Sequence, residues 1–496
     1  MIKIRVVKTA SKSSAVQVIE YKNYSRKILK HIGSAKSESE LSTLLNHAEE
    51  WVKSYMGQLA LFNDGKPDNI LHLDHFEFLG IYYHFLHETI STIQSQLGYT
   101  SLLHPLLHDL VVMRILEPTS KLRSIDLMKQ YFGLNHNRKN YYKQALQWLD
   151  LKQKVEDKIT AFAKQEYSFN YDLVFYDVTT LYFETFEEDE LRKNGFSKDK
   201  KSDQPQILVA LMVSKEGFPV GYQIFEGSTF EGHTFIPAIQ SFVKSNKVEN
   251  LVVIADAAMI SDDNVEALKQ KGIHYIVGAR LGNVTAELLE EIDTKLSRVD
   301  EQIIRLQTNK GYLICSFSKT RFRKDKYEME KQIERAQNLI ATPSKSKKTK
   351  FTKSKGEQYE LNQKLIDKTA KLLGIKGYYT DLKEEDCNSK SVIERYHQLY
   401  KIEQAFRITK SDLATRPIFH YKQQPIQLHM LICFMALSTV KHIELQTKIS
   451  IKKFVDESKK ISDARMLNKI TRKEISIRVK ITEKMSEYLT LLKIPH

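Results

Sequence analysis

The hydrophobic and polar positions of this chain change their spacing along the sequence, and each change predicts a change of structure. Before residue 171, apolar side chains mostly recur at intervals of three and four, which is typical of amphipathic helices. Between residues 171 and 280, short apolar runs alternate with helical patterns, as in an α/β sheet. Residues 281–390 are mixed and basic, and helical spacing returns from residue 391.

Residues 1–165 form a predicted N-terminal region that is mainly helical. It opens with two strand-like runs, Ile2–Val7 and Ala15–Tyr21. A basic patch follows at Lys22, Arg26, Lys27 and Lys30. The rest is helical in pattern, including three short basic helices expected at Leu102–Ile115, Ser120–Tyr131 and Lys139–Leu149. Such helices suit a helix-turn-helix-like unit that binds DNA, and a solvated helical linker fits the same pattern.

Strand-like runs follow one another between residues 171 and 280. A meander of three strands is predicted at Leu173–Val178, Ile207–Val213 and Val220–Phe225. The first run is apolar apart from Asp177, and a later buried run, Leu251–Ala255, ends on Asp256. Three strands followed by helix–strand–helix–strand is the order of a ribonuclease-H-like α/β fold. Open sheets of this kind place their sites at strand ends, where both aspartates are expected.

A basic insertion is predicted at residues 281–390. Its most charged part, Ser344–Gly356, has six lysines in 13 residues. This loop either contacts phosphates or is simply solvated. Residues 391–445 are expected to complete the core that residues 171–280 begin, with a long buried helix at Gln427–Leu445. Residues 446–496 are predicted to form C-terminal helices.

The segment Ser391–Leu413 has no Pro or Gly and predicts one amphipathic helix. Its apolar face holds Leu399, Ile402, Phe406 and Leu413. A neighbouring stripe sets one carboxylate among two phenols and two cations, at Tyr396, Tyr400, Glu403, Arg407 and Lys410. A surface ion pair between Glu403 and Arg407 would explain this stripe without any function.

The charge balance narrows the choice of partner. The chain has 496 residues, with 76 Lys and Arg against 61 Asp and Glu, a net charge of +15 and a pI near 9.2. Such an excess favours a polyanionic partner, either nucleic acid or an anionic membrane surface. No apolar run approaches the ~18 residues of a membrane span, so we expect nucleic acid and no membrane. Three widely separated cysteines indicate a reducing cytoplasm.

Asp177, Asp256 and Glu403 would form an all-oxygen cluster if the fold brought them together. Such clusters suit Mg²⁺ or Mn²⁺. Two such ions about 3.5–4 Å apart can activate a water or a 3′-hydroxyl and stabilise the leaving oxygen of a phosphodiester. An unpaired aspartate is costly to bury, so each needs a reason, and capping a following turn is the simpler one.

The motifs around these acids resemble those of the DDE transposases of bacterial insertion sequences. The likeness is to the insertion-sequence-four branch with its Tyr-Arg-Glu-Lys signature. Asp177 in YDVTTLYFE resembles the first acid, Asp256 in VIADAAMIS the second, and Glu403 the third. Tyr396 and Lys410 occupy signature positions around Glu403. The signature's Arg is Leu399 in this chain, so Arg395 or Arg407 would have to replace it.

The resemblance implies an enzyme that cuts the inverted-repeat ends of an element and joins their 3′-hydroxyls to target DNA. It implies two Mg²⁺ or Mn²⁺ ions on Asp177, Asp256 and Glu403, and DNA contacts from Tyr396, Arg407 and Lys410. It also implies double-stranded DNA as partner, a homo-oligomer, and a place in the cytoplasm at the bacterial nucleoid.

Two alternatives stay open. The first is a ribonuclease-H-like nuclease or resolvase that cuts without joining. The second is a non-catalytic DNA-binding protein derived from a transposase. That protein would be expected to have lost at least one acid, whereas all three are present in this chain.

Overall fold

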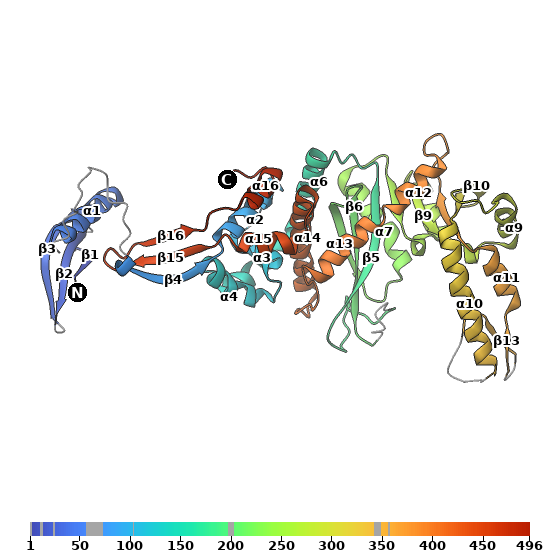
Figure 1. The fold of residues 1–496 in the computed structure, drawn as a ribbon, viewed down its shortest axis with the longest axis horizontal. Helices are drawn as coiled ribbons and strands as arrows, with labels where there is room; N and C mark the ends of the chain where they lie inside the picture. The colour runs from blue at the N-terminus through green and yellow to red at the C-terminus, as the bar shows by residue number, and fades with distance from the viewer. Residues whose placement is uncertain are drawn as a thin grey trace. The chain divides into compact units, whose positions relative to one another are not determined.

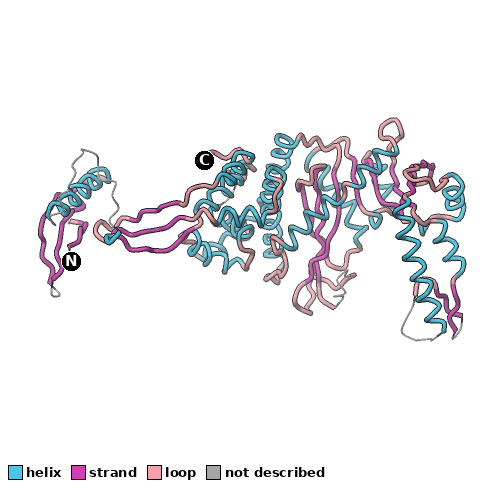
Figure 2. The backbone as a smooth tube through the Cα atoms, viewed as in Figure 1, coloured by secondary structure: helices cyan, strands magenta, loops and turns pink. Residues whose placement is uncertain are grey.

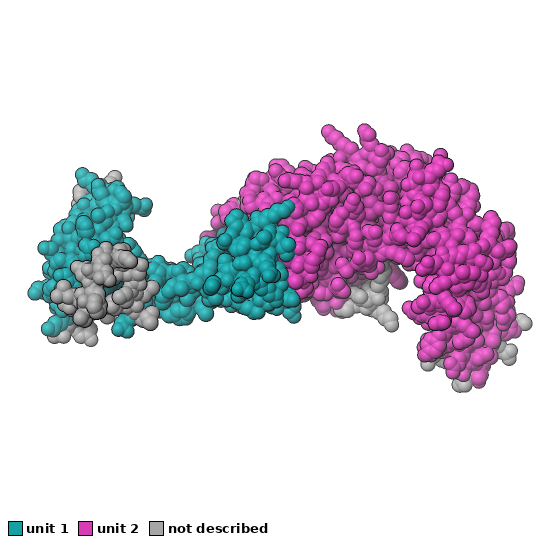
Figure 3. Space-filling view, turned by 45° about the horizontal axis from the view of Figure 1, so that its top comes forward, with its two compact units in different colours: residues 1–90, 125–136, 452–496 teal, residues 91–124, 137–451 magenta. Residues whose placement is uncertain are grey.

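The computed structural model describes residues 2–9, 13–22, 25–55, 73–102, 104–196, 203–341, 349–355 and 358–496. The chain divides into two compact units (Figure 3), made of residues 1–90, 125–136 and 452–496, and of residues 91–124 and 137–451. We call these unit 1 and unit 2. The domain limits expected from the sequence, at residues 165, 280, 390 and 445, stay a prediction. Residues 344–348 and 356 of the predicted lysine-rich loop lie outside the described residues.

Unit 1 begins with a three-stranded antiparallel sheet in the order β1 (Ile2–Lys8), β2 (Ser14–Lys22), β3 (Ser25–Ala35). Helix α1 (Glu38–Tyr55) packs on one face, where Ala48 and Val52 meet Val16 and Val18. The first two strands were predicted, but the basic patch was expected to precede helices and instead opens a third strand. Strand β3 lies at an edge of the sheet with most side chains exposed, so its apolar pattern is weak and pairing with β2 defines it.

A second sheet in unit 1 joins distant parts of the chain in the order β16 (Glu474–Arg478), β15 (Asp463–Asn468), β4 (Phe76–Tyr82). Residues 446–496 were expected to be helical, and so was the segment around β4. Both expectations were wrong for these strands. The partners in β15 and β4 are almost 400 positions apart in the sequence, so no local pattern predicts that they pair. The remaining C-terminal elements, α15 (Ile451–Lys459) and α16 (Glu483–Leu491), are helices as predicted.

Unit 2 is built on an eight-stranded mixed sheet in the order β10-β11-β14-β9-β8-β5-β6-β7 (Figure 1). Strands β5 (Val174–Tyr182), β6 (Gln206–Ser214) and β7 (Pro219–Glu226) form the predicted antiparallel meander. Strands β8 (Val252–Ala255) and β9 (His274–Ala279) continue the sheet in parallel with β5. Along the chain, helix α7 (Glu231–Asn246) lies between β7 and β8, and helix α8 (Asp262–Gln270) lies between β8 and β9. The predicted order of elements is therefore confirmed.

Residues 281–390 extend this sheet beyond β9. Strands β14 (Ile375–Thr380), β11 (Gly311–Phe317) and β10 (Ile303–Thr308) add to it one after another, all antiparallel. The same segment also contains α9 (Ala286–Lys295), the long α10 (Lys319–Ala341), the hairpin β12 (Thr352–Lys355) and β13 (Gln358–Leu361), and α11 (Gln363–Lys371). Part of the expected insertion is therefore continuous with the central sheet.

The remaining helices are shown in cyan in Figure 2. The three predicted short helices are present as α3 (Pro105–Leu116), α4 (Lys121–Phe132) and α5 (Arg138–Gln144), with α2 (His84–Gln96) before them and α6 (Lys152–Tyr167) after them. The apolar helix α14 (Gln423–Thr447) is long and apolar enough to cross a bilayer, but 94% of its apolar window is buried inside the protein. It packs against α3 as a core helix.

The single helix expected at Ser391–Leu413 is two helices, α12 (Ser389–His397) and α13 (Tyr400–Ser411). The amides of Gln398 and Leu399 bond to carbonyls three residues back, at 3.1 and 3.0 Å, so one tight turn of 3₁₀ type separates the helices. Neither Pro nor Gly marks this turn in the sequence. Tyr396 and Glu403 consequently stand on different helices.

Candidate active site

Asp177 and Asp256 lie side by side on adjacent parallel strands. The last aligned pair between β5 and β8 is Tyr176 with Ala255; Asp177 is the next residue of β5, and Asp256 directly follows the end of β8. Neighbouring strands are about 4.8 Å apart, and residues at matching positions point to the same face. Asp256 follows the end of β8, as predicted. Asp177 is in the middle of β5 and not at its end, because the strand continues to Tyr182 in its pairing with β6.

Each aspartate uses one oxygen locally. The Asp256 Oδ1 accepts a 2.6 Å hydrogen bond from the amide of Ala257 and caps a short 3₁₀ turn. The Asp177 Oδ1 accepts 2.8 Å from the amide of Val178. Asp256 is exposed and Asp177 is half-buried. Asp256 therefore caps a turn, which is the simpler explanation that the sequence offered. This cap uses only the Oδ1 atom of the carboxylate.

Glu403 is exposed in the first turn of α13, a helix that packs against β5 and β6. Its carboxylate and that of Asp256 act on the same two side chains, because both raise the pKa of Lys376 and both raise that of Tyr396. Glu403 makes no ion pair with Arg407, although the structure describes both residues. The surface ion pair that would have explained this stripe is thus absent.

Lys376 on β14 is the functional candidate that the sequence did not reveal. Its ammonium lies 5.0 Å from the ring centroid of Tyr396 and 5.5 Å from that of Tyr378. Burial lowers the pKa of Lys376, and the charge of Arg321 lowers it further, whereas Asp256 and Glu403 oppose this. Nothing in IKGYYT marks this lysine, since only the pairing of β14 with β9 brings it to the acids.

Tyr396 connects α12 to the second aspartate. Its hydroxyl donates a 3.4 Å hydrogen bond to Asp256 Oδ1, and its ring packs on Tyr378 with centroids 4.8 Å apart. Burial raises the pKa of Tyr396, with Asp256 the next cause, so the phenol stays protonated and can donate. The side chain is only 8% exposed.

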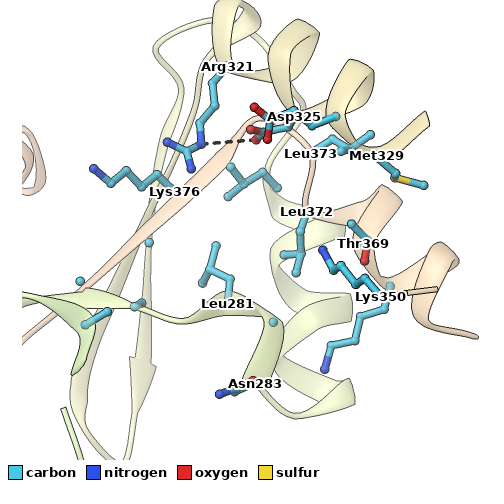
Figure 4. Close-up of a pocket in the computed structure, with 18 of the residues that line it drawn as sticks. Leu281, Asn283, Arg321, Asp325, Met329, Lys350, Thr369, Leu372, Leu373 and Lys376 are labelled. Carbon is cyan, nitrogen blue, oxygen red and sulfur yellow. Dashed lines mark ion pairs between the residues drawn. The ribbon is translucent and has the colours of Figure 1, made fainter. Parts of the chain in front are cut away.

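A cavity of about 600 Å³ begins at Asp256 and Tyr396 and extends between β14, α10 and α11 (Figure 4). Four cations line it, at Arg321, Lys350, Lys368 and Lys376. Arg321 pairs with Asp325 at 3.3 Å. Glu328 is a further acid in the wall. The cavity therefore joins the acids to a surface that favours negatively charged ligands.

The remaining predicted contact residues lie on α13. Arg407 is exposed, one turn beyond Glu403, and Lys410 is half-buried. Leu399, at the signature's Arg position, is only 9% exposed and packs in the core. Asp177 thus lies on β5 one residue beyond its last pair with β8, Asp256 directly follows β8, Glu403 lies on a helix packed against β5, and Arg407 is exposed.

A set of three carboxylates fits a hard divalent cation such as Mg²⁺. All three cysteines are free and buried, and a buried thiol offers such an ion nothing. The donor set at Asp177, Asp256 and Glu403 is therefore made of carboxylate oxygens alone, the ligands that Mg²⁺ and Mn²⁺ prefer.

Comparison with known proteins gives one family match. The profile described as "Transposase DDE domain" matches residues 168–439, which is more than half of the chain. No curated protein matches the sequence. Among solved structures, the chain is similar to a piggyBac transposase synaptic complex with hairpin DNA, at 11% identity and a TM-score of 0.38, over 82% of this chain and 75% of that one.

Proposed function

The chain belongs to the family of transposases with a DDE domain, and we propose that it cuts DNA at the inverted-repeat ends of an insertion sequence and joins the 3′-hydroxyls to target DNA. Membership of the family implies an enzyme that cleaves nucleic acid, binds DNA and depends on a divalent metal. The observation that carries the finer proposal is the pairing of Tyr176 with Ala255, which sets Asp177 beside Asp256. Glu403, on a helix packed against the same strand β5, supplies the third acid.

We propose that the core is ribonuclease-H-like. The order β7-β6-β5-β8-β9, with an antiparallel meander followed by two parallel strands, supports this. We also propose that the enzyme is of the insertion-sequence-four branch. Tyr396, Glu403 and Lys410 support this assignment, and Leu399 departs from it. Leu399 is buried, whereas Arg407 is exposed and can reach DNA. We therefore propose that Arg407 takes the place of the signature's arginine.

Asp177, Asp256 and Glu403 would hold two Mg²⁺ or Mn²⁺ ions. When bound, such ions activate an attacking water or 3′-hydroxyl and stabilise the leaving oxygen. The residues of the chain do the rest. Tyr396 orients the Asp256 carboxylate through its hydroxyl. Lys376 places positive charge beside two acids, and Arg407 would position a DNA phosphate without reading its sequence.

We further propose in what assembly and where in the cell the reaction takes place. Paired element ends require at least two copies of a single-site enzyme, so we propose a homo-oligomer acting at the nucleoid in the cytoplasm. Recognition of the ends is assigned to the segment before residue 165. The alternative nuclease or resolvase would share the acids and would differ only in failing to join the ends.

The test is incubation of the protein with Mg²⁺ and a DNA fragment that carries the repeats flanking its own coding sequence, followed by mapping of every new end. A transposase gives cuts at the repeat boundaries and, with a target plasmid, joined products. Cuts without joined products would favour the nuclease. Binding without any cut would favour the non-catalytic protein.

A further inference from the structure

The N-terminal sheet and its helix carry opposite charges. Strands β1, β2 and β3 contain seven Lys and Arg and a single acid, Glu20. Helix α1, on the other side of the same small core, contains four Glu and one Lys. A body divided in this way has one orientation of lowest energy near a polyanion, with the sheet toward it and the helix away.

Four of the seven cations lie on the edge strand β3 or at the end of β2 that pairs with it. We use the name basic strip for Lys22, Arg26, Lys27 and Lys30, all of which are exposed. No acid in the described part of the chain forms an ion pair with them. Two apolar side chains beside them, Tyr21 and Ile28, are 45% and 52% exposed. The strip is therefore a band of unpaired cations interleaved with apolar contact area.

We propose that this sheet, through the basic strip, is the surface of unit 1 that binds double-stranded DNA. The inference rests on the proposed function and goes beyond it, because the sequence assigned DNA binding to the short helices α3–α5. Of these helices, α3 has a buried side chain at almost every position and offers no face to DNA. The edge strand β3 and the end of β2 instead present exposed lysine and arginine, the side chains that contact DNA phosphates.

A second explanation of the strip is protection of an edge strand, since lysines on sheet edges discourage pairing with other chains. A charge of either sign is enough to protect an edge strand, whereas DNA binding requires a positive charge. A substitution that keeps a charge and reverses its sign therefore separates the two. Lys30→Glu retains the protection and removes the attraction to phosphate.

The experiment uses the full chain, because β4 needs its partner β15 from the C-terminal end. One variant carries Arg26→Gln, Lys27→Gln and Lys30→Gln. The matched control carries Lys129→Gln, Lys139→Gln and Lys143→Gln, three exposed lysines of α4 and α5, so both lose the same net charge. Affinity for a duplex of the terminal repeat is measured over a range of salt without divalent metal, with gel filtration to check that each protein is monodisperse.

We expect the strip variant to lower the slope of log affinity against log salt by about three, one for each cation that no longer meets a phosphate, and the control to leave it nearly unchanged. Lys30→Glu should weaken binding in a monodisperse protein. The reverse ranking, or equal effects of the two triple variants, would overturn the proposal. A wild-type chain that neither binds nor cuts the repeats would instead overturn the proposed function itself.

Discussion

The hydroxyl of Tyr396 on α12 donates its hydrogen bond to the carboxylate of Asp256 at the end of β8, 140 residues earlier in the chain. The tyrosine was expected from the sequence to face DNA. In the structure it is almost buried, and its hydroxyl connects the helix pair that carries Glu403 to the strand that carries Asp256. We infer that it holds two parts of one site in register.

Loss of any one acid should remove cleavage. Asp177→Asn, Asp256→Asn and Glu403→Gln each keep shape and remove a charge, so cleavage of the repeat ends should fall by at least ~10³-fold while end binding persists. Gel assays of both activities measure this. Glu394→Gln, at an exposed position of α12, is the control and should cut normally. Near-normal cutting by one of the three variants would remove that residue from the site.

Gly278 should tolerate no side chain while Tyr396 keeps its hydroxyl. A Cβ there would lie 2.5 Å from the Tyr396 oxygen, so Gly278→Ala must push the phenol away from Asp256. We expect a loss of roughly 1–3 kcal/mol in unfolding free energy together with slower cleavage.

The matched control is Gly282→Ala, where a Cβ meets nothing within 4 Å. Adding Tyr396→Phe to Gly278→Ala should recover part of the lost stability, because the clashing oxygen is gone. Additive losses in the double variant, measured by chemical denaturation, would show that the two residues are not coupled.

Removal of Lys376 should separate metal binding from cleavage. Lys376→Gln takes away a cation that shares its surroundings with two carboxylates, so Mn²⁺ should bind the free protein more tightly, by about 1 kcal/mol or fivefold. Cleavage at saturating metal should nevertheless be slower, since a cation beside the acids no longer offsets the negative charge of the DNA. Lys364→Gln, at an exposed lysine of α11 that does not line the cavity, should alter neither quantity. Calorimetric titration of Mn²⁺ that gives equal affinities for wild type and Lys376→Gln would contradict the idea.

Arg407 should contribute one phosphate contact. Arg407→Ala is expected to weaken DNA binding equally for all end sequences and to lower the salt slope by about one. Lys390→Ala, an exposed lysine of α12, makes the same change in net charge and should leave the slope unaltered. If both variants lower the slope alike, the contribution of Arg407 is general surface charge and not a specific contact.

Acid should destabilise unit 2 through two histidines, the half-buried His420 and the buried His429. Burial and the charges of Lys121 and Arg114 lower the pKa of His420 to about 4, and burial lowers the pKa of His429 well below its usual value. In the unfolded chain both groups titrate near 6.5. Stability that depends on neutral histidine is therefore complete above pH 6.5 and is lost as the pH falls from 6.5 toward 4.

Thermal melting between pH 7.5 and pH 4.5 measures this loss. His420→Asn should flatten the dependence of the melting temperature on pH over that range. His429 should be left in place, because it accepts from Lys121 at 2.8 Å and its removal would leave a buried amine without that partner. A slope unchanged in His420→Asn would assign the acid sensitivity to other groups.

Local patterns in the sequence were enough to predict several features of the fold. The apolar runs before Asp177 and Asp256 predicted β5 and β8, and the order of strands and helices around them predicted the central sheet. The spacing around Glu403 predicted a helical carboxylate, and the excess of lysine and arginine predicted a polyanionic partner. Strands and helices depend on neighbours within about ten residues, and the net charge depends on composition alone. Both can therefore be predicted from the sequence.

Other features depend on residues that are far apart in the sequence, and these were visible only in the folded structure. Strand β3 and the sheet of β4 and β15 exist because one strand supplies hydrogen bonds to another, and polar or basic strands carry little pattern of their own. The turn at Gln398 and Leu399 follows from packing on two surfaces, not from a helix-breaking residue. Lys376 reaches Asp256 because β14 pairs with β9, and Tyr396 reaches it because α12 lies against that strand. The three acids were proposed from the sequence and their role stays a prediction, whereas the contacts of Lys376 and Tyr396 could not be proposed from it.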